Sequence, residues 1–154
     1  MHTASYEHDR IIDDIEKVCR ESGERLTDLR KEILSLMLKE EKPLKAYEIL
    51  EKMRDYGKKL TPATIYRVLD FLTEKGFVHR INFLNAFIPC TEDHKKRPSI
   101  LFVCSVCFKT VEIDDQSIYN ILQDHINSIG TIHDKECIEI CGMCKDCLEK
   151  NGQG

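Results

Sequence analysis

The stretch TPATIYRVLDFLTEKG, residues 61–76, decides how the first half of the chain folds. Thr61 is a helix N-capping residue, and Pro62 suits the first helical position, where its missing N–H costs nothing. Gly76 supplies the left-handed residue that ends a helix. The pattern therefore predicts a helix from Pro62 to about Lys75. Its buried stripe comprises Ile65, Val68, Leu69 and Leu72, which leaves Ala63, Thr64, Tyr66, Arg67 and Asp70 outside the stripe.

Helical periodicity also precedes this stretch. Apolar residues recur at helical spacing from Ile11 to Cys19, and Gly23 ends the pattern. Thr27 can cap a second helix, and Pro43 separates it from a third short one. The apolar positions of the second and third helices are Leu29, Ile33, Leu34, Leu36, Met37, Leu38, Ala46, Ile49, Leu50 and Met53.

The hydrophobic period changes from helix to strand after Gly76. Residues 77–81 and 86–90 are short β-type runs around a turn at 82–85, and they predict a hairpin. Helices followed by a two-stranded hairpin describe a winged helix-turn-helix. In that fold the 62–75 helix is the recognition helix for the DNA major groove.

A second, smaller domain is predicted after a polar linker. Strand-like runs at 100–104, 109–113 and 137–140 flank a helix that carries Ile118 to Ile129 and ends at Gly130. The predicted fold class is therefore α+β, with a winged-helix domain at 1–90, a hinge at 91–99 and a small α/β domain at 100–154.

Two cysteine pairs lie in the second domain. Cys104-Ser-Val-Cys107 and Cys144-Lys-Asp-Cys147 are separated by 36 residues. Each C-x-x-C turn brings two sulfurs to one point, and together they supply the four ligands of a tetrahedral Zn²⁺ ion. The alternatives are a pair of disulfides or two redox motifs, but matched pairs favour structural zinc.

Composition limits the other functional classes. No run of 18 apolar residues could span a membrane, and the N-terminus lacks the apolar stretch of a signal peptide. Eight cysteines then indicate thiolates kept reduced for metal, and the expected compartment is the cytoplasm. Residues 25–67 contain 11 basic and 7 acidic residues, although the net charge of the chain is −4. A basic segment in an acidic chain fits a nucleic-acid reader joined to another domain.

The chain resembles the Fur family of metal-dependent bacterial repressors, and within it the zinc uptake regulators. Four segments carry the resemblance: residues 25–27, residues 46–48, residues 62–79 and the two cysteine pairs. The resemblance implies a homodimer with a C-terminal dimerisation domain, two winged-helix DNA readers, and a regulatory metal at the hinge.

Within this resemblance, a regulatory site is predicted from His79, Cys90, His94 and Glu112. Two imidazoles, a thiolate and a carboxylate form a tetrahedral set suited to zinc, so we expect two Zn²⁺ per protomer. Three ligands belong to the wing and linker and one to the second domain, so closing the site would fix the angle between domains. Each residue also has an ordinary structural reading, for example Cys90 as a small buried hydrophobe.

Other histidines and cysteines leave alternatives open. His94 is the least typical ligand for the family, and His133 or His125 could replace it. A third metal site could combine those histidines with Cys137 and Cys141. Cys141 could also exchange into the structural site.

Tyr66 and Arg67 on the predicted recognition helix are the residues expected to touch DNA. Arginine can bind guanine O6 and N7 bidentately, whereas tyrosine more often reaches phosphate or a thymine methyl, and Tyr66 could instead be partly buried under the wing. Further predicted DNA contacts, mostly to phosphate, are Thr64, Tyr47, Lys45, Lys58 and Lys59. The sequence therefore predicts a zinc-responsive repressor of zinc-uptake genes that binds double-stranded operator DNA.

Two alternatives are a Fur-family sensor of iron, manganese or peroxide, and a zinc-ribbon adaptor without DNA specificity. Catalysis and a small-molecule substrate are not expected, because no nucleophile–base pair stands apart from the metal ligands.

Overall fold

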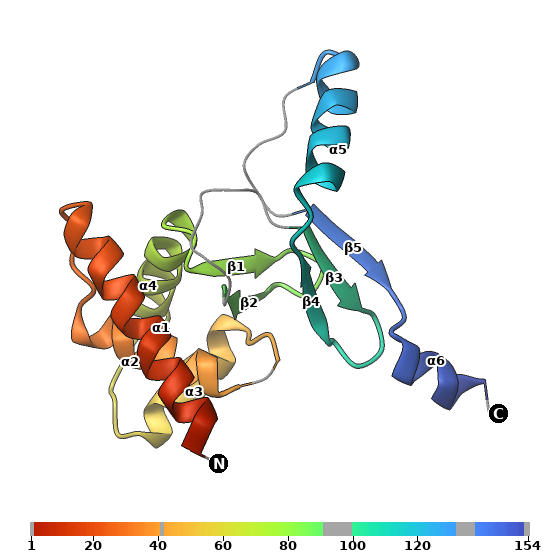
Figure 1. Cartoon of the computed structure of the whole chain (residues 1–154). Coiled ribbons are helices and arrows are strands. Elements are labelled where there is room, and N and C mark those ends of the chain that lie inside the picture. Colours follow the sequence, from red (N-terminus) through yellow and green to blue (C-terminus); the bar gives the residue numbers. More distant parts are fainter. Residues whose placement is uncertain (1, 41, 91–99, 132–137, 153–154) are drawn as a thin grey trace. The chain divides into compact units, whose positions relative to one another are not determined.

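The computed structural model divides the chain into two compact units, Met1–Lys95 and Lys96–Gly154. It describes residues 2–40, 42–90, 100–131 and 138–152 (Figure 1). The predicted hinge, residues 91–99, lies outside the described residues, so the predicted domain boundaries stay a prediction.

The first unit contains four helices and a hairpin. Thr27 and Thr61 cap their helices as predicted, because each hydroxyl accepts a hydrogen bond from the backbone N–H three residues later. Pro62 begins its helix, and Gly76 adopts φ +77° just beyond its end. The helices are α1 (His2–Glu21), α2 (Asp28–Lys39), α3 (Ala46–Asp55) and α4 (Pro62–Glu74).

The four helices enclose one apolar core. All four predicted stripe residues of α4 are buried, and Ile65, Leu69 and Leu72 are completely so. Cys19, the last residue of the apolar pattern in the first predicted helix, is 1% exposed and lies in this core. Phe71 is also buried, although it lies outside the predicted stripe.

The hairpin confirms the predicted wing. Strands β1 (Val78–Ile81) and β2 (Ala86–Pro89) pair antiparallel, with His79 opposite Ile88. Asn85 closes the turn with φ 48°, a conformation that asparagine tolerates better than most residues. Leu44 exchanges two backbone hydrogen bonds with Phe87, and this bridge fixes the hairpin to the segment before α3.

The second unit is a three-stranded sheet with two helices, in strand order β4-β3-β5. Strands β3 (Ile100–Cys104) and β4 (Thr110–Ile113) pair antiparallel, whereas β3 and β5 (Ile138–Gly142) pair parallel. Helices α5 (Gln116–Ser128) and α6 (Lys145–Asn151) complete it. The sequence does not predict helix α6, because its seven residues after Cys144 are too few to show an apolar period.

The apolar core of the second unit is small. Its buried residues among those described are Ile100, Leu101, Val103, Cys104 and Cys147. No described residue of α5 is buried, and its apolar residues Ile118 and Ile121 are 45% and 60% exposed. Hydrophobic burial therefore does little to hold this unit together.

None of the described helices is both long and apolar enough to cross a membrane.

Candidate functional site

The parallel pairing of β3 and β5 brings the two cysteine pairs together. The register places Cys104 beside Gly142, and both strands run the same way into a cysteine pair. Ser105 fixes this edge, because its backbone N–H and its hydroxyl both donate to the Gly142 carbonyl, at 2.8 and 3.1 Å. Gly142 is constrained in turn, since a Cβ there would lie 3.0 Å from the Phe102 ring.

The four sulfurs form a cluster of the size that a zinc ion needs. The Sγ atoms of Cys104, Cys107, Cys144 and Cys147 all lie within 4.8 Å of one another. The Cys107 and Cys144 sulfurs are 3.7 Å apart. Four sulfurs at Zn–S distances of 2.3 Å stand about 3.8 Å apart in a tetrahedron. This spacing is too long for a disulfide, and every described cysteine is free.

Backbone donors prepare the cluster for metal. The N–H groups of Cys107 and Cys144 donate to Cys104 Sγ and lower the pKa of that thiol to about 6. Hydrogen bonds with the Cys107 and Cys144 sulfurs raise the pKa of the Cys147 thiol to about 12. One ligand is thus a thiolate before metal arrives, which favours capture of a cation.

These supporting groups are absent from the sequence prediction. Phe108 adopts φ 62° and donates its N–H to the Cys104 carbonyl at 3.0 Å, so the chain turns back over the first cysteine pair. Lys109 lies 3.5 Å from Asp146 and joins the two pairs by an exposed ion pair. A C-x-x-C spacing predicts such backbone donors in general, but it does not predict that Phe108 adopts a left-handed conformation.

The hairpin register places two of the predicted regulatory ligands together. Cys90 follows β2 and donates its N–H to the Phe77 carbonyl at 2.9 Å, next to β1. The side-chain ligand atoms of His79 and Cys90 lie within 4.8 Å of each other. Cys90 is 5% exposed and His79 is half-buried, so the pair is partly shielded from water.

The other predicted metal ligands differ in what the structure shows of them. Glu112 lies on β4 in the second unit, half-buried and opposite Leu101. His94, His133 and Cys137 lie outside the described residues. His125 and Cys141 are exposed, and neither belongs to a potential metal cluster among the described residues.

The recognition helix presents its predicted DNA-reading residues to solvent. Tyr66 is 50% exposed and Arg67 is also exposed on α4. Tyr47, Lys45 and Lys59 are exposed around α3 and the turn before α4.

The structure gives two predicted phosphate contacts internal partners. The Lys58 ammonium lies 2.8 Å from a Glu32 carboxylate oxygen, and the Thr64 hydroxyl lies 2.9 Å from that of Thr61. Both remain predictions, but either contact with DNA would have to share or replace a partner.

Comparison with known proteins identifies the family. The model of the ferric uptake regulator family matches residues 21–140. The zinc uptake regulation protein of Escherichia coli (strain K12) is 33% identical over 135 residues, which cover 87% of this chain and 79% of that protein.

The chain belongs to the ferric uptake regulator family. A ferric uptake regulation protein of Staphylococcus epidermidis is 31% identical over 138 residues, 87% of this chain and 94% of that relative. This family consists of transcription regulators, which are not an enzyme class.

Solved structures of family members share the fold. A zinc uptake regulator complexed with zinc and DNA superposes with a TM-score of 0.84 at 29% identity, covering 94% of this chain and 97% of that one. Holo XcZur superposes with a TM-score of 0.80 at 32% identity, covering 90% of this chain and 96% of that one. The winged-helix and α/β architecture predicted from the sequence is confirmed.

The cysteine cluster should be indispensable to the second unit. Replacing buried Cys104 with Ser removes the thiolate that receives two N–H donors, so we expect loss of zinc, of folded structure and of dimers. Circular dichroism, metal analysis and sedimentation would measure these losses. Cys141→Ser is the matched control, because Cys141 is exposed on the neighbouring strand and lies outside the cluster. A folded Cys104→Ser dimer would contradict this role.

Zinc binding to the metal-free cluster should release fewer than four protons at pH 7. Cys104, with a pKa of about 6, is already largely deprotonated there, whereas Cys147 must lose its proton. Release should rise by up to one proton as the pH falls through 6, and zinc affinity should fall more steeply below that point. Calorimetry in buffers of different ionisation enthalpy measures the release. A count independent of pH between 5 and 7 would be inconsistent with the lowered pKa.

Proposed function

We propose that this chain is a zinc-responsive, DNA-binding repressor of zinc-uptake genes that acts as a homodimer. The observation that carries the choice of metal is the close approach of His79 and Cys90 on the wing hairpin. A thiolate beside an imidazole favours zinc over iron or manganese, which prefer ligand sets rich in oxygen and nitrogen. This pair argues against an iron sensor, although ferric uptake regulators are among the relatives.

The regulatory site is proposed to comprise His79, Cys90, His94 and Glu112, with a second zinc at the four cysteines. Such a site takes ligands from both units, so metal would bind best when the units hold one arrangement. A ligand shifts a conformational equilibrium only by its differential affinity for the two states, and this ligand set would provide that difference. Zinc would then fix the spacing of two recognition helices to match two half-sites of an operator.

The exposed apolar residues of the second unit support the homodimer. Helix α5, its C-cap residue and strand β5 expose Ile118, Ile121, Ile129 and Ile140 by 45% to 74%. A small domain with an uncovered apolar helix gains stability by burying it against a second copy. DNA-binding proteins of this class act in the cytoplasm, which is the compartment that we propose.

Tyr66 and Arg67 are proposed to read bases from α4, with Tyr47, Lys45, Lys58, Lys59 and Thr64 at phosphates. Arg67 forms no ion pair with any residue that the structure describes, so its guanidinium is available to a guanine. A bidentate contact of this kind contributes about 1–3 kcal/mol of discrimination.

Arg67→Ala should abolish selective DNA binding and leave zinc content and dimerisation unchanged. The probe is a duplex that the zinc-loaded wild-type protein selects from a random pool, and the readout is affinity relative to a base-shuffled duplex. Arg20→Ala is the control, because it removes the same charge from an exposed position at the end of α1. Full-strength selective binding by Arg67→Ala would remove this residue from the proposal.

Cys90→Ser should retain one zinc per protomer and lose the zinc dependence of DNA binding. The wild-type protein should hold two zinc ions, since only the hairpin thiolate is removed and the four-cysteine cluster stays intact. Metal analysis and DNA titrations at buffered free zinc, iron or manganese would measure both effects, with Cys141→Ser as control. Binding that follows iron or manganese, or a wild-type zinc response in Cys90→Ser, would defeat the assignment.

A further inference from the structure

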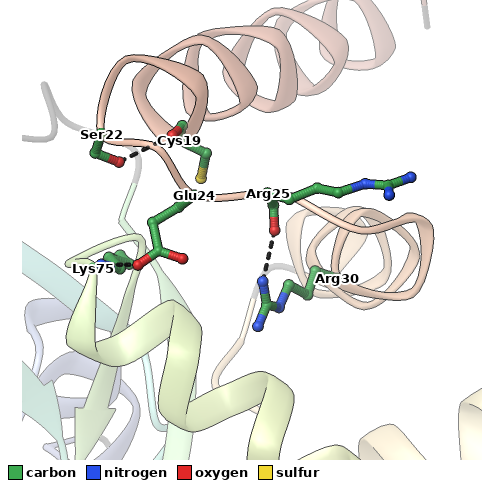
Figure 2. Close-up of polar contacts among 6 residues, drawn as sticks. All are labelled: Cys19, Ser22, Glu24, Arg25, Arg30 and Lys75. Atoms are coloured by element: carbon green, nitrogen blue, oxygen red, sulfur yellow. Dashed lines mark hydrogen bonds and ion pairs between the residues drawn. The ribbon is translucent and has the colours of Figure 1, made fainter.

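Arg30 on α2 makes one contact with the recognition helix and one with the segment before α2. Its guanidinium carbon lies 3.4 Å from the centroid of the Phe71 ring on α4. Its Nη1 donates to the Arg25 carbonyl at 2.6 Å, in the segment that leads into α2 (Figure 2). A guanidinium stacked on an aromatic face is attracted by the ring quadrupole and also packs flat against it. This stack covers a phenylalanine that lies off the apolar stripe of α4.

A second contact holds the same end of α4. Lys75, the C-cap of α4, lies 2.8 Å from Glu24 in the turn after α1 (Figure 2). Their hydrogen bond lowers the pKa of Glu24 and raises that of Lys75, so both stay charged at neutral pH. The Lys75 ammonium also lies 5.9 Å from the Phe71 centroid. The ring is therefore in contact range of two cations, each bonded to the segment between α1 and α2.

Because Phe71 lies on α4, these contacts can affect how α4 is oriented toward DNA. Phe71 follows Arg67 by four residues, so the two lie one turn apart on the same side of the helix. A helix with its side chains has a radius of about 5–6 Å, so a rotation of roughly 10° moves a side chain by about 1 Å. A displacement of that size is enough to spoil a bidentate hydrogen bond to a base.

We propose that Arg30 is a positioning residue for sequence recognition: by stacking on Phe71, together with the Glu24–Lys75 ion pair, it fixes the rotation of α4. Tyr66 and Arg67 are thereby held at the angle that base reading requires. Arg30 and Lys75 act inside the domain and not on phosphate, although both are cations near the recognition helix. This role rests on the proposed DNA-binding function and adds to it a determinant of specificity that never touches DNA.

The test is the ratio of affinities for the selected duplex and the base-shuffled duplex, measured with zinc-loaded protein across a salt series. Arg30→Met keeps the apolar stem and removes the guanidinium. We expect the ratio to fall at least tenfold, with shuffled-duplex affinity changed less than twofold. The dependence on log salt should not change, because no phosphate contact is lost. Phe71→Leu should lower the ratio similarly, and the double variant should lose little more than either single one.

Glu16→Gln is the matched control. It breaks a Glu16–Lys31 ion pair of 2.7 Å between α1 and α2. The side-chain exposure of this pair is close to that of Glu24 and Lys75, but the pair forms no ion pair with a described residue of α4. This variant should keep the wild-type ratio. If Arg30→Met does not fold, Glu24→Gln and Lys75→Met carry the same test, with an expected fall of at least threefold.

Each other outcome has a definite reading. An unchanged ratio in the folded variants, or an equal loss on both duplexes, would overturn the positioning role and leave the proposed function standing. A salt dependence reduced by about one ion would also overturn it, because Arg30 would then contact phosphate. A wild-type protein that selects no sequence would refute the proposed function itself.

Discussion

The parallel pairing of β3 with β5 is the constraint on which the second unit depends. Side by side and in the same direction, the two strands deliver four sulfurs to one edge of the sheet. Few apolar side chains are buried around that edge, so the unit needs a bond between its segments that hydrophobic contact does not supply. A zinc site of this type contributes about 10–16 kcal/mol to the folding of small domains. Strand order and metal chemistry therefore depend on each other.

Charge in the first unit is arranged differently from what composition suggests. The excess of basic residues between positions 25 and 67 resembles one DNA-binding surface. In the folded unit several of these cations have internal partners, including Lys31 with Glu16, Lys52 with Glu40 and Lys58 with Glu32. Internal pairing therefore lowers the number of cations that can bind DNA without sharing or exchanging a partner. A count of charges thus overstates the size of the DNA-binding surface.

The features of the sequence that predicted the fold are those with local causes. The cap at Thr61, Pro62 at the helix start and Gly76 after its end act within a few residues, and the structure agrees with each of them. Phe71 and α6 were missed because their causes lie elsewhere in the chain. Phe71 is covered by Arg30 from another helix, and α6 is a short helix of seven residues that begins directly after Cys144.

The metal sites divide in the same way between local and distant causes. The four-cysteine cluster could be predicted completely, because a repeated C-x-x-C spacing is itself a geometric statement. His79 and Cys90 come together through hairpin register, which the alternating pattern implies. His94 and Glu112 have no such local cause, because their proposed roles depend on how separate segments of the chain meet. Residue type and spacing alone do not fix that meeting.

The wide separation of the two cysteine pairs also affects how fast the second unit can form. Residues 108–143 must close as one loop before β5 can lie beside β3, and only that closure completes the sulfur cluster. Loop closure of this length costs chain entropy before any contact repays it, and parallel pairing is intrinsically slow. A zinc ion held first by Cys104 and Cys107 would bind Cys144 and Cys147 when chain diffusion brings that second pair close. Metal supply would then control the rate at which active protein appears after synthesis, as well as its final amount.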